Sequence, residues 1–291
     1  GEIYNYLELR RNLISKGMSF KTNSDTEVLL NLYMYYGKEC VTKLNGMFAF
    51  AIYDIVEDSI FLARDHLGVK PLYYTYQDGE FIFASEVKAI LKYPSVKAQV
   101  DMQSVNEYLT FQVMLKKHTL FKDIHTLDPA TYIYIKNGKI KEKRKYWDFK
   151  YDIDDSKTQE QYSDELLHLL EDSVRIQTRS DVPVGAYLSG GIDSSLVSTL
   201  AKNSYIGDFH TFCGSYKDSK EFDETKYANI VHKSIDSIHH ETFPTSQEFI
   251  DNFEKITYHM DYPEAGPGVF SQYMVSELAS KHVKVVLGGQ G

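Results

Sequence analysis

A short polar stretch between two apolar runs constrains this chain more than any other feature. Residues 182–188 read VPVGAYL, a continuous apolar run typical of a fully buried strand. Downstream, Leu196, Val197 and Leu200 recur at the spacing of one helix face. The junction at 189–195, SGGIDSS, is therefore a strand–loop–helix turn. Because glycines let backbone N–H groups approach an anion and a helix N-terminus offers unpaired donors, this junction predicts a phosphate-binding loop.

Two common phosphate loops do not fit the junction. The Walker loop requires a lysine, and none occurs in residues 187–200; the G-x-G-x-x-G fingerprint has a different spacing. An N-capped helix after a glycine-rich turn is the ordinary alternative, because Ser and Asp are favoured there for capping alone. Seven ordered positions after a strand of buried type favour the phosphate loop.

The second half of the chain alternates strand-like and helix-like segments. Besides the junction, helices are predicted at 161–178, 224–234, 246–260 and 269–282, and strands at 209–216, 239–244 and 283–289. This alternation predicts an α/β fold with a doubly wound parallel sheet, in which ligands bind beyond the carboxyl ends of the strands. We expect the strand ends at 189–191, 213–215 and 288–289 to converge there.

The first half has a different pattern, with short aromatic and β-branched runs from Met47 to about Trp147. The dipeptides Asp78-Gly79 and Asn137-Gly138 predict hairpin turns. One helix is predicted over 4–16, ending at Gly17, and a second up to Gly37, opened by a capping box in the sequence SDTE at 24–27.

A polar stretch at 148–158 reads as a linker between these halves. We therefore expect an α+β unit at 1–150 and an α/β unit at 158–291, which suits a length of 291 residues. No apolar run is long enough to span a bilayer. The net charge of −9 argues against a nucleic-acid-binding surface, and two distant cysteines indicate neither a disulfide framework nor a zinc site. A cytoplasmic setting is the default expectation.

Histidines are scattered, but the pair His239-His240, with His232 nearby, raises the question of a metal site. The pair lies in a period-2 strand pattern, so the two side chains point to opposite faces and cannot easily share one ion. We interpret these histidines as surface and packing residues.

The loop SGGIDSS resembles the pyrophosphate loop of ATP pyrophosphatases, which cleave ATP between its α and β phosphates. The first half of the chain indicates which family of ATP pyrophosphatases it resembles. The stretches GEIYN at 1–5, SDTEV at 24–28, LNGMFAFAIYD at 44–54, RDHLGVKPLYY at 64–74 and FASEVKAIL at 83–91 resemble the class II glutaminase domain of glutamine-hydrolysing asparagine synthetases. The segment YWDF at 146–149 and the junction itself match the same family, so the resemblance covers essentially the whole chain.

The resemblance implies a two-site ligase with an αββα sandwich followed by an adenine nucleotide α-hydrolase-like sheet. In the first domain, an N-terminal cysteine releases ammonia from glutamine. In the second, ATP with Mg²⁺ adenylates aspartate, and ammonia displaces AMP to give asparagine. The substrates would be glutamine, aspartate and ATP, with no nucleic-acid or membrane partner, and the resemblance leaves a homodimer open.

The resemblance also assigns site residues. Glu2 and Asp25 would bind the amino group of glutamine, and Gly1 would supply a backbone N–H to the oxyanion hole. An acidic residue at a helix start is favoured in any case, so Asp25 can serve both purposes. Asp193 would be the carboxylate on the Mg²⁺ side. The ATP-binding residues would be Leu188, Ser189, Gly190, Gly191, Asp193, Ser194, Ser195, Gly214, Gly288 and Gly289.

The match departs from the family at both ends. The chain opens inside a motif, so the nucleophilic cysteine is expected upstream of Gly1, and the segment as given is expected to lack glutaminase activity. The chain also stops where the family continues, so we expect a fragment truncated at both ends, with no catalytic residue of the glutaminase in it. Cys40 and Cys213 are expected to be small buried residues rather than substitutes.

Gln290 stands where many family members carry a carboxylate, and a glutamine cannot act as a general base. Two alternatives therefore stay open: a related amidotransferase acting on another carboxylate, and a non-catalytic member of the family. A tRNA-modifying pyrophosphatase is a weaker alternative, because it would need a basic surface and would lack GEIYN.

Overall fold

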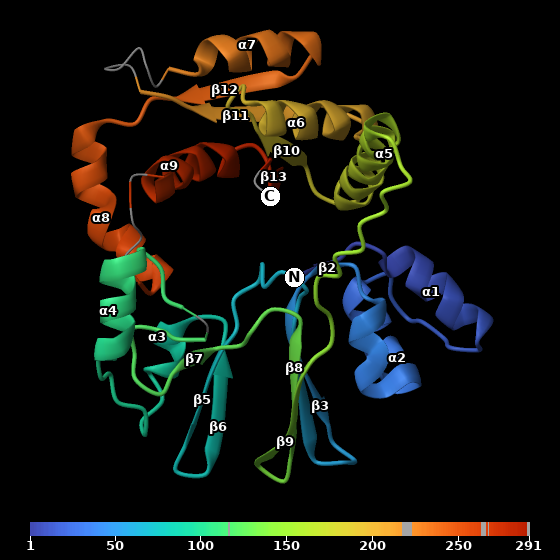
Figure 1. Cartoon of the computed structure of the whole chain (residues 1–291), viewed down its shortest axis with the longest axis vertical. Coiled ribbons are helices and arrows are strands. Elements are labelled where there is room, and N and C mark those ends of the chain that lie inside the picture. Colours follow the sequence, from blue (N-terminus) through green and yellow to red (C-terminus); the bar gives the residue numbers. More distant parts are fainter. Residues whose placement is uncertain (116, 217–222, 263–265, 267, 290–291) are drawn as a thin grey trace. The chain divides into compact units, whose positions relative to one another are not determined.

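The computed structural model of the chain describes residues 1–115, 117–216, 223–262, 266 and 268–289 (Figure 1). The chain divides into two compact units. The first comprises Gly1–Asp152 with Asp261–Pro263, and the second Ile153–Met260 with Glu264–Gly291. Among the described residues, every helix is too short or too polar to cross a membrane.

The first unit contains two larger antiparallel sheets, a two-stranded one, and the helices that pack on them. Its elements are β1 (Glu2–Ile3), α1 (Tyr6–Ser15), α2 (Asp25–Tyr36), the 3-10 helix η1 (Gly37–Lys43), β2 (Gly46–Met47), β3 (Ala49–Asp54), β4 (Ser59–Arg64), β5 (Tyr73–Gln77), β6 (Glu80–Ala84), α3 (Val87–Ile90), α4 (Met102–Phe111), β7 (His125–Thr126), β8 (Thr131–Lys136) and β9 (Lys139–Lys145). The larger sheet has the order β3-β4-β8-β9 and the smaller one β6-β5-β7, while β1 pairs with β2.

Both predicted hairpin turns are confirmed, and their backbone angles show why the sequence could locate them. Asp78-Gly79 joins β5 to β6 and Asn137-Gly138 joins β8 to β9, with positive φ at all four residues. Two consecutive positive φ angles match the twist of adjacent strands, and Asn, Asp and Gly adopt them at the lowest cost.

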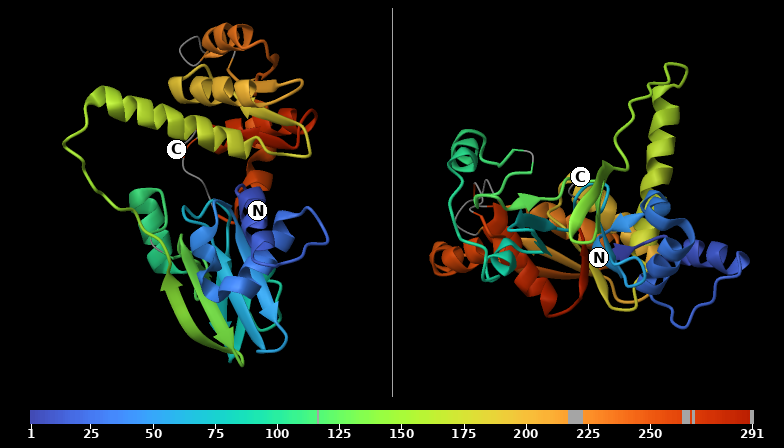
Figure 2. Two further views of the ribbon diagram at one scale, coloured as in Figure 1. Left: turned by 90° about the vertical axis from the view of Figure 1, so that its right-hand side faces the viewer. Right: turned by 90° about the horizontal axis from the view of Figure 1, so that it is seen from below.

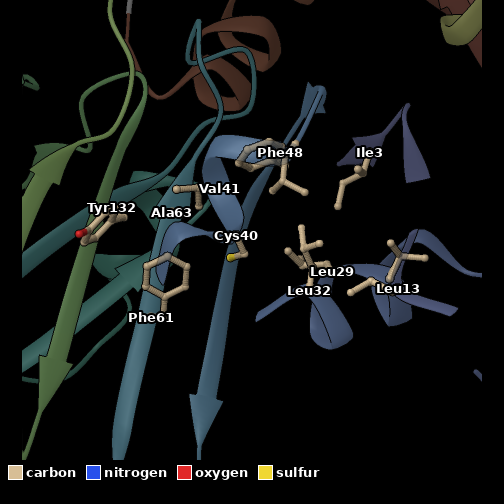
Figure 3. Close-up of a cluster of buried hydrophobic side chains, with 12 residues drawn as sticks. Ile3, Leu13, Leu29, Leu32, Cys40, Val41, Phe48, Phe61, Ala63 and Tyr132 are labelled. Atoms are coloured by element: carbon tan, nitrogen blue, oxygen red, sulfur yellow. The ribbon is translucent and has the colours of Figure 1, made fainter. Parts of the chain in front are cut away.

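Apolar clusters hold the layers of this unit together. One cluster lies between the two sheets and takes residues such as Leu62 and Ile133 from the larger sheet and Tyr74 from the smaller one. A second lies between the larger sheet and helices α1 and α2 and includes Cys40, Phe61 and Tyr132 (Figure 3). A third packs Val87 and Ile90 of α3 against β5 and β6. Helices therefore cover the outer side of each sheet.

The apolar run at 47–54, MFAFAIYD, is interrupted at Phe48, between β2 and β3. Asp65, which follows β4, takes the place of a ladder partner there. Its Oδ2 accepts from the backbone N–H of Phe48 at 3.1 Å, and its own N–H donates to the carbonyl of Phe48 at 2.8 Å. A side-chain contact across 17 residues therefore breaks the strand, although the apolar pattern continues through it.

The capping box predicted at 24–27 is only half formed. The side chain of Ser24 accepts from the N–H of Thr26 at 3.1 Å, as an N-cap should. The Glu27 carboxylate instead turns back to the N–H groups of Lys21 and Thr22, at 2.7 and 2.6 Å. The reciprocal half of the prediction is wrong because these two earlier amides take the acceptor that would have bound the Ser24 N–H.

The second unit is built on a four-stranded parallel sheet in the order β12-β11-β10-β13. Its elements are α5 (Gln159–Gln177), β10 (Val184–Tyr187), α6 (Ile192–Ser204), β11 (His210–Gly214), α7 (Thr225–Ser234), β12 (Ile238–Thr242), α8 (Ser246–Met260), α9 (Gly268–Ser280) and β13 (Val285–Leu287). The predicted parallel sheet is confirmed. β10 starts at Val184 rather than 182; the preceding Pro183 carries no N–H for a ladder bond.

Helices cover both faces of this sheet. Val174 of α5 and Leu200 of α6 pack on one face with Ala186 of β10. Val275 and Ala279 of α9 pack on the other face against Phe212. Two views at right angles to Figure 1 show α5 as the long helix and α9 beside the sheet (Figure 2).

The strand order has a functional consequence. The chain moves from β10 to β11 and β12 on one side and later returns to β13 on the other, so its order reverses at β10. In open α/β sheets, ligands bind at such a switch point, outside the carboxyl ends of the strands. The loop that follows β10 is the junction SGGIDSS.

Candidate functional site

The glycines of the junction are required by the backbone path. Gly190 has a φ of +86°, and a Cβ placed on it would lie 2.4 Å from Cβ of Tyr227 and 2.5 Å from the backbone nitrogen of Ala228. The loop therefore runs directly against the first turn of α7, where only glycine fits. Gly191 is the N-cap of α6, and a glycine offers no side chain to cap the N–H groups of the first turn.

Two serine hydroxyls hold the loop in shape. The Oγ atoms of Ser189 and Ser194 lie 2.9 Å apart, and the Ser189 Oγ also accepts from the N–H of Gly191 at 3.3 Å. The Ser194 hydroxyl lies 3.2 Å from the Gly191 carbonyl. These bonds stabilise a loop whose helix N–H groups carry no side-chain cap, which is the arrangement of an anion-binding turn.

The remaining polar side chains of the junction differ in exposure. Asp193 is exposed in the first turn of α6. The hydroxyl oxygen of Ser195 is buried and has no hydrogen-bond partner within the described structure. Mg²⁺ is commonly bound through one or two protein carboxylates together with substrate phosphates, so the donor set at Asp193 fits a Mg²⁺ shared with a phosphate.

The predicted strand ends gather around this loop to different degrees. Leu188 is fully buried, and its N–H donates to the carbonyl of Phe212 at 2.8 Å. Gly289, two residues after β13, runs against α6, because a Cβ on it would lie 2.5 Å from the backbone nitrogen of Ser194. Gly288 comes between that strand and Gly289. The close approach at the switch point therefore joins the end of β13 to the start of α6.

Gly214, at the carboxyl end of β11, has a packing reason to be glycine. A Cβ there would lie 2.5 Å from Cγ2 of Val275 on α9. Its assignment to ATP therefore stays a prediction. Gln290 lies outside the described residues.

We expect Gly190→Ala to lower the free energy of unfolding of the second unit by about 3 kcal/mol, because left-handed strain and a clash with α7 add up. Gly79→Ala is a matched control: its φ is +83° and nothing lies within 4 Å of the added Cβ, so about 1 kcal/mol is expected. Urea unfolding followed by circular dichroism measures both. Equal losses for the two variants would contradict the close packing of the loop.

The residues predicted to bind glutamine come together at the start of the first unit. β1 pairs with β2, with Glu2 opposite Met47. The carboxylate of Asp25, at the start of α2, accepts from the N–H of Ile3 at 3.1 Å and so fixes β1 beside the helix. Asp25 thus has a structural role that sequence reasoning did not identify, and it stands next to exposed Glu2.

The backbones around Glu2 approach closely. A Cβ on Gly1 would lie 2.6 Å from the Met47 carbonyl, and one on Gly46 would lie 2.2 Å from the Glu2 carbonyl. Tyr4 lies just behind, and burial, followed by the negative charges of Glu2 and Asp65, raises its pKa to about 12. This end of the unit is therefore a tightly packed backbone platform with two carboxylates, Glu2 and Asp25, at its rim.

Neither cysteine of the chain is suited to nucleophilic chemistry. Cys40 is fully buried in the cluster of Figure 3, and burial raises the pKa of its thiol to about 12. Burial likewise raises the pKa of Cys213 to about 12. A reactive cysteine needs an accessible, low-pKa thiolate, so the interpretation of both as small buried residues is supported.

Two features were missed at the level of sequence. The carboxylate of Asp65 organises the loop that supports β2, and His210, His240 and His282 come together on one face of the parallel sheet. Asp65 lies in the stretch RDHLGVKPLYY, but its role depends on long-range contacts. The histidines are 30 and 42 residues apart, and only the placement of α9 brings the third one in.

Comparison with known protein families gives two matches, one in each half of the chain. A family described as "Glutamine amidotransferase domain" matches residues 1–147, and one described as "Asparagine synthase" matches residues 165–291.

Among curated proteins, the chain is similar to a putative glutamine-hydrolysing asparagine synthetase 2 of Methanocaldococcus jannaschii, with 37% identity over 299 residues, covering 100% of this chain and 56% of that protein. It is 36% identical over 293 residues to the glutamine-hydrolysing asparagine synthetase 1 of Bacillus subtilis, covering 100% of this chain and 45% of that protein. The asparagine synthetase B of Escherichia coli is 31% identical over 312 residues, with 100% and 50% covered. The chain spans about half the length of the curated relatives it matches.

Proposed function

The chain belongs to the glutamine-hydrolysing asparagine synthetase family, and from that premise we propose that the full-length protein makes asparagine from aspartate with glutamine as the nitrogen donor. The first unit would be its class II glutamine amidotransferase domain, an αββα sandwich when complete. The second would be its ATP-pyrophosphatase domain. The observation that carries the proposal is the uncapped glycine loop at the switch point of the parallel sheet, in a chain that also carries the glutamine amidotransferase domain.

In the first unit, we propose that Glu2 and Asp25 bind the ammonium group of glutamine. Two carboxylates at the rim of a packed backbone platform suit a cation, and charge-assisted hydrogen bonds hold it in one orientation. The backbone N–H of Gly1 would donate to the oxyanion that develops on the side-chain amide. Hydrolysis of that amide yields glutamate and ammonia.

In the second unit, the N–H groups of the first turn of α6 and the hydroxyls of Ser189, Ser194 and Ser195 would hold the β and γ phosphates of ATP. Leu188, Gly214, Gly288 and Gly289 would line the nucleotide. Asp193 would hold Mg²⁺, which supplies positive charge against the pyrophosphate. The unpartnered Ser195 hydroxyl supports this role, because a buried hydroxyl without a partner is costly unless a ligand satisfies it.

The chemistry that this loop would serve is an acyl adenylation. A carboxylate oxygen of aspartate attacks the α phosphorus, and the bond to the bridging oxygen breaks, so pyrophosphate leaves. Ammonia then attacks the activated carbonyl, AMP leaves, and one proton is released. In this arrangement the helix N-terminus and the loop donors would face the leaving pyrophosphate and stabilise charge where it develops.

We expect Glu2→Gln in the full-length protein to raise the KM for glutamine about ten- to hundredfold, because a charge-assisted contact contributes roughly 1.5–3 kcal/mol. Asp25→Asn is expected to act likewise, with some loss of stability because Asp25 also holds β1. Ammonia-dependent asparagine formation should stay near wild type, since free ammonia bypasses this contact. Saturation curves for glutamine and ammonium chloride measure both.

Glu39→Gln is the matched control, because Glu39 is an exposed carboxylate of the same unit, 3.1 Å from Arg144. It should leave both curves unchanged. If ammonia-dependent synthesis falls as steeply as the glutamine-dependent rate in Glu2→Gln, this residue supports the fold rather than the substrate, and the assignment of the glutamine site is wrong.

A further inference from the structure

Three histidines meet on the face of the parallel sheet that α9 covers. His210 is the first residue of β11, and His240 lies on β12 opposite Phe212, so the two occupy diagonal positions of neighbouring strands. Their Nδ1 and Nε2 atoms are 3.0 Å apart. His282 follows the end of α9 by two residues, and its ring centroid lies 3.9 Å from that of His240.

From this cluster we infer a metal site for a first-row divalent ion that prefers imidazole, with Zn²⁺ as the best fit. One nitrogen from each of the three rings lies within 4.8 Å of the other two. Around a tetrahedral zinc with bonds of about 2.0–2.1 Å, neighbouring nitrogens would be about 3.3 Å apart. The three nitrogens are therefore close to ligand spacing, and the fourth position would take water.

The rings must reorient to bind the ion. All three are stacked, with interplanar angles of 13° between His210 and His240, 20° between His210 and His282, and 25° between His240 and His282, so their nitrogen lone pairs run nearly parallel instead of converging. His282 is exposed in the turn after α9, so its ring can rotate without disturbing the sheet. The Nδ1 atom of His210 and the Nε2 atom of His240 already lie 3.0 Å apart, and one of these two rings must also turn for both lone pairs to point at one ion.

The surroundings favour a cation. The Asp208 carboxylate interacts with His210, and it can offset part of the charge of an ion. The C-terminal end of α9 also directs its negative dipole toward this region.

The site is separate from the proposed ATP loop. His210 opens its strand, and His282 precedes β13, so both lie toward the amino ends of the strands, whereas the junction SGGIDSS follows a carboxyl end. We propose that the ion is structural: it would tie the turn between α9 and β13 to β11 and β12.

A zinc titration of the 291-residue chain, without an affinity tag and after treatment with EDTA, tests this inference. The chain competes with a chromophoric chelator for Zn²⁺ in the presence of excess Mg²⁺, which occupies oxygen sites but not imidazole. We expect one equivalent bound with submicromolar affinity. His240→Gln and His282→Gln should each weaken binding at least tenfold, and Zn²⁺ should raise the melting temperature of the wild-type chain but not of these variants.

Two variants serve as matched controls. His239→Gln changes the neighbouring residue, whose ring points to the other face and stacks on His232 at 4.7 Å, and His168→Gln removes an exposed histidine of α5. Both should keep wild-type affinity. Less than one equivalent bound by the wild type, or a loss in His239→Gln equal to that in His240→Gln, would overturn the site. Because His282 is exposed, its variant remains informative even if His240→Gln fails to fold.

Discussion

Asp65→Ala is expected to lower the free energy of unfolding of the first unit by about 4 kcal/mol. The carboxylate of Asp65 is 1% exposed, and it accepts from four backbone N–H groups: Phe48 at 3.1 Å, Leu67 at 3.2 Å, and Val69 and Lys70 at 2.9 Å. Removing it leaves these donors without an acceptor, and the contact with Phe48 is buried while the other three are part-buried. Each unsatisfied buried group costs about 1–3 kcal/mol, reduced where the loop relaxes.

Arg64, the residue before Asp65, stabilises the same loop by binding its carbonyl groups. The guanidinium of Arg64 donates to the carbonyls of Lys70, Leu127 and Gly68 at 2.7, 2.6 and 2.6 Å. A planar group with five donors suits three carbonyls in fixed positions. The dipeptide Arg64-Asp65 therefore satisfies carbonyls with one side chain and amides with the other.

Unfolding of this unit can be followed selectively. Trp147 is the single tryptophan of the chain, and its ring centroid lies 5.2 Å from that of His66, next to Asp65. Its fluorescence in a urea titration reports the loss of local structure. Asp54→Ala is the control, because Asp54 accepts from the N–H groups of Val56 and Glu57 in an exposed turn, where water can replace it. We expect less than about 1 kcal/mol for it. A similar small loss for Asp65→Ala would show that its four contacts contribute little.

The effect of Asp65→Ala should extend to the proposed glutamine site. Asp65 holds Phe48, Met47 precedes it in β2, and Met47 pairs with Glu2. Asp65 touches neither carboxylate of the proposed site, so it is a positioning residue. This explains physically why an Arg-Asp dipeptide accompanies the glutaminase motifs, which the resemblance alone did not.

The features that the sequence predicted depend on local chemistry. The turn at Asp78-Gly79 requires two positive φ angles, and the junction at 189–195 places Gly190 where α7 approaches. The Asp-Gly dipeptide and the glycines of the junction reveal these two backbone constraints in the sequence itself. The alternation of strands and helices in the second half was likewise enough to predict a parallel sheet, because each helix must cross back to the start of the next strand.

The features that were missed depend on distant partners. α4 (Met102–Phe111) and the two-residue strand β1 were not predicted, since β1 exists only through its pairing with β2 and its contact with Asp25. The break at Phe48 depends on Asp65. The meeting of His240 with His282 depends on the path of α9 over the sheet. The hydrophobic periodicity of a segment indicates which face of the helix or strand is apolar, but it does not indicate which distant segment packs on that face.

Asp193→Asn in the full-length protein is expected to lower aspartate-dependent pyrophosphate release at least a hundredfold, about 2.7 kcal/mol of transition-state stabilisation. The variant keeps the shape of the side chain and removes the charge that the proposed Mg²⁺ contact requires. Because the residue is exposed, the fold should be unaffected. Glutamine hydrolysis without aspartate should persist, since the proposed glutamine-binding residues, Glu2 and Asp25, lie in the other unit. Pyrophosphate and glutamate are measured in parallel assays.

Glu160→Gln separates the proposed role of Asp193 from a simpler one. An acidic side chain in the first turn of any helix interacts favourably with the helix dipole, by about 0.3–1 kcal/mol. Glu160 stands in the first turn of α5 as Asp193 does in that of α6. If the dipole is the whole reason for Asp193, both variants lose the same small amount of stability and both keep pyrophosphate release. If Asp193 acts on the phosphates, only its variant loses that activity, and stability does not distinguish the two.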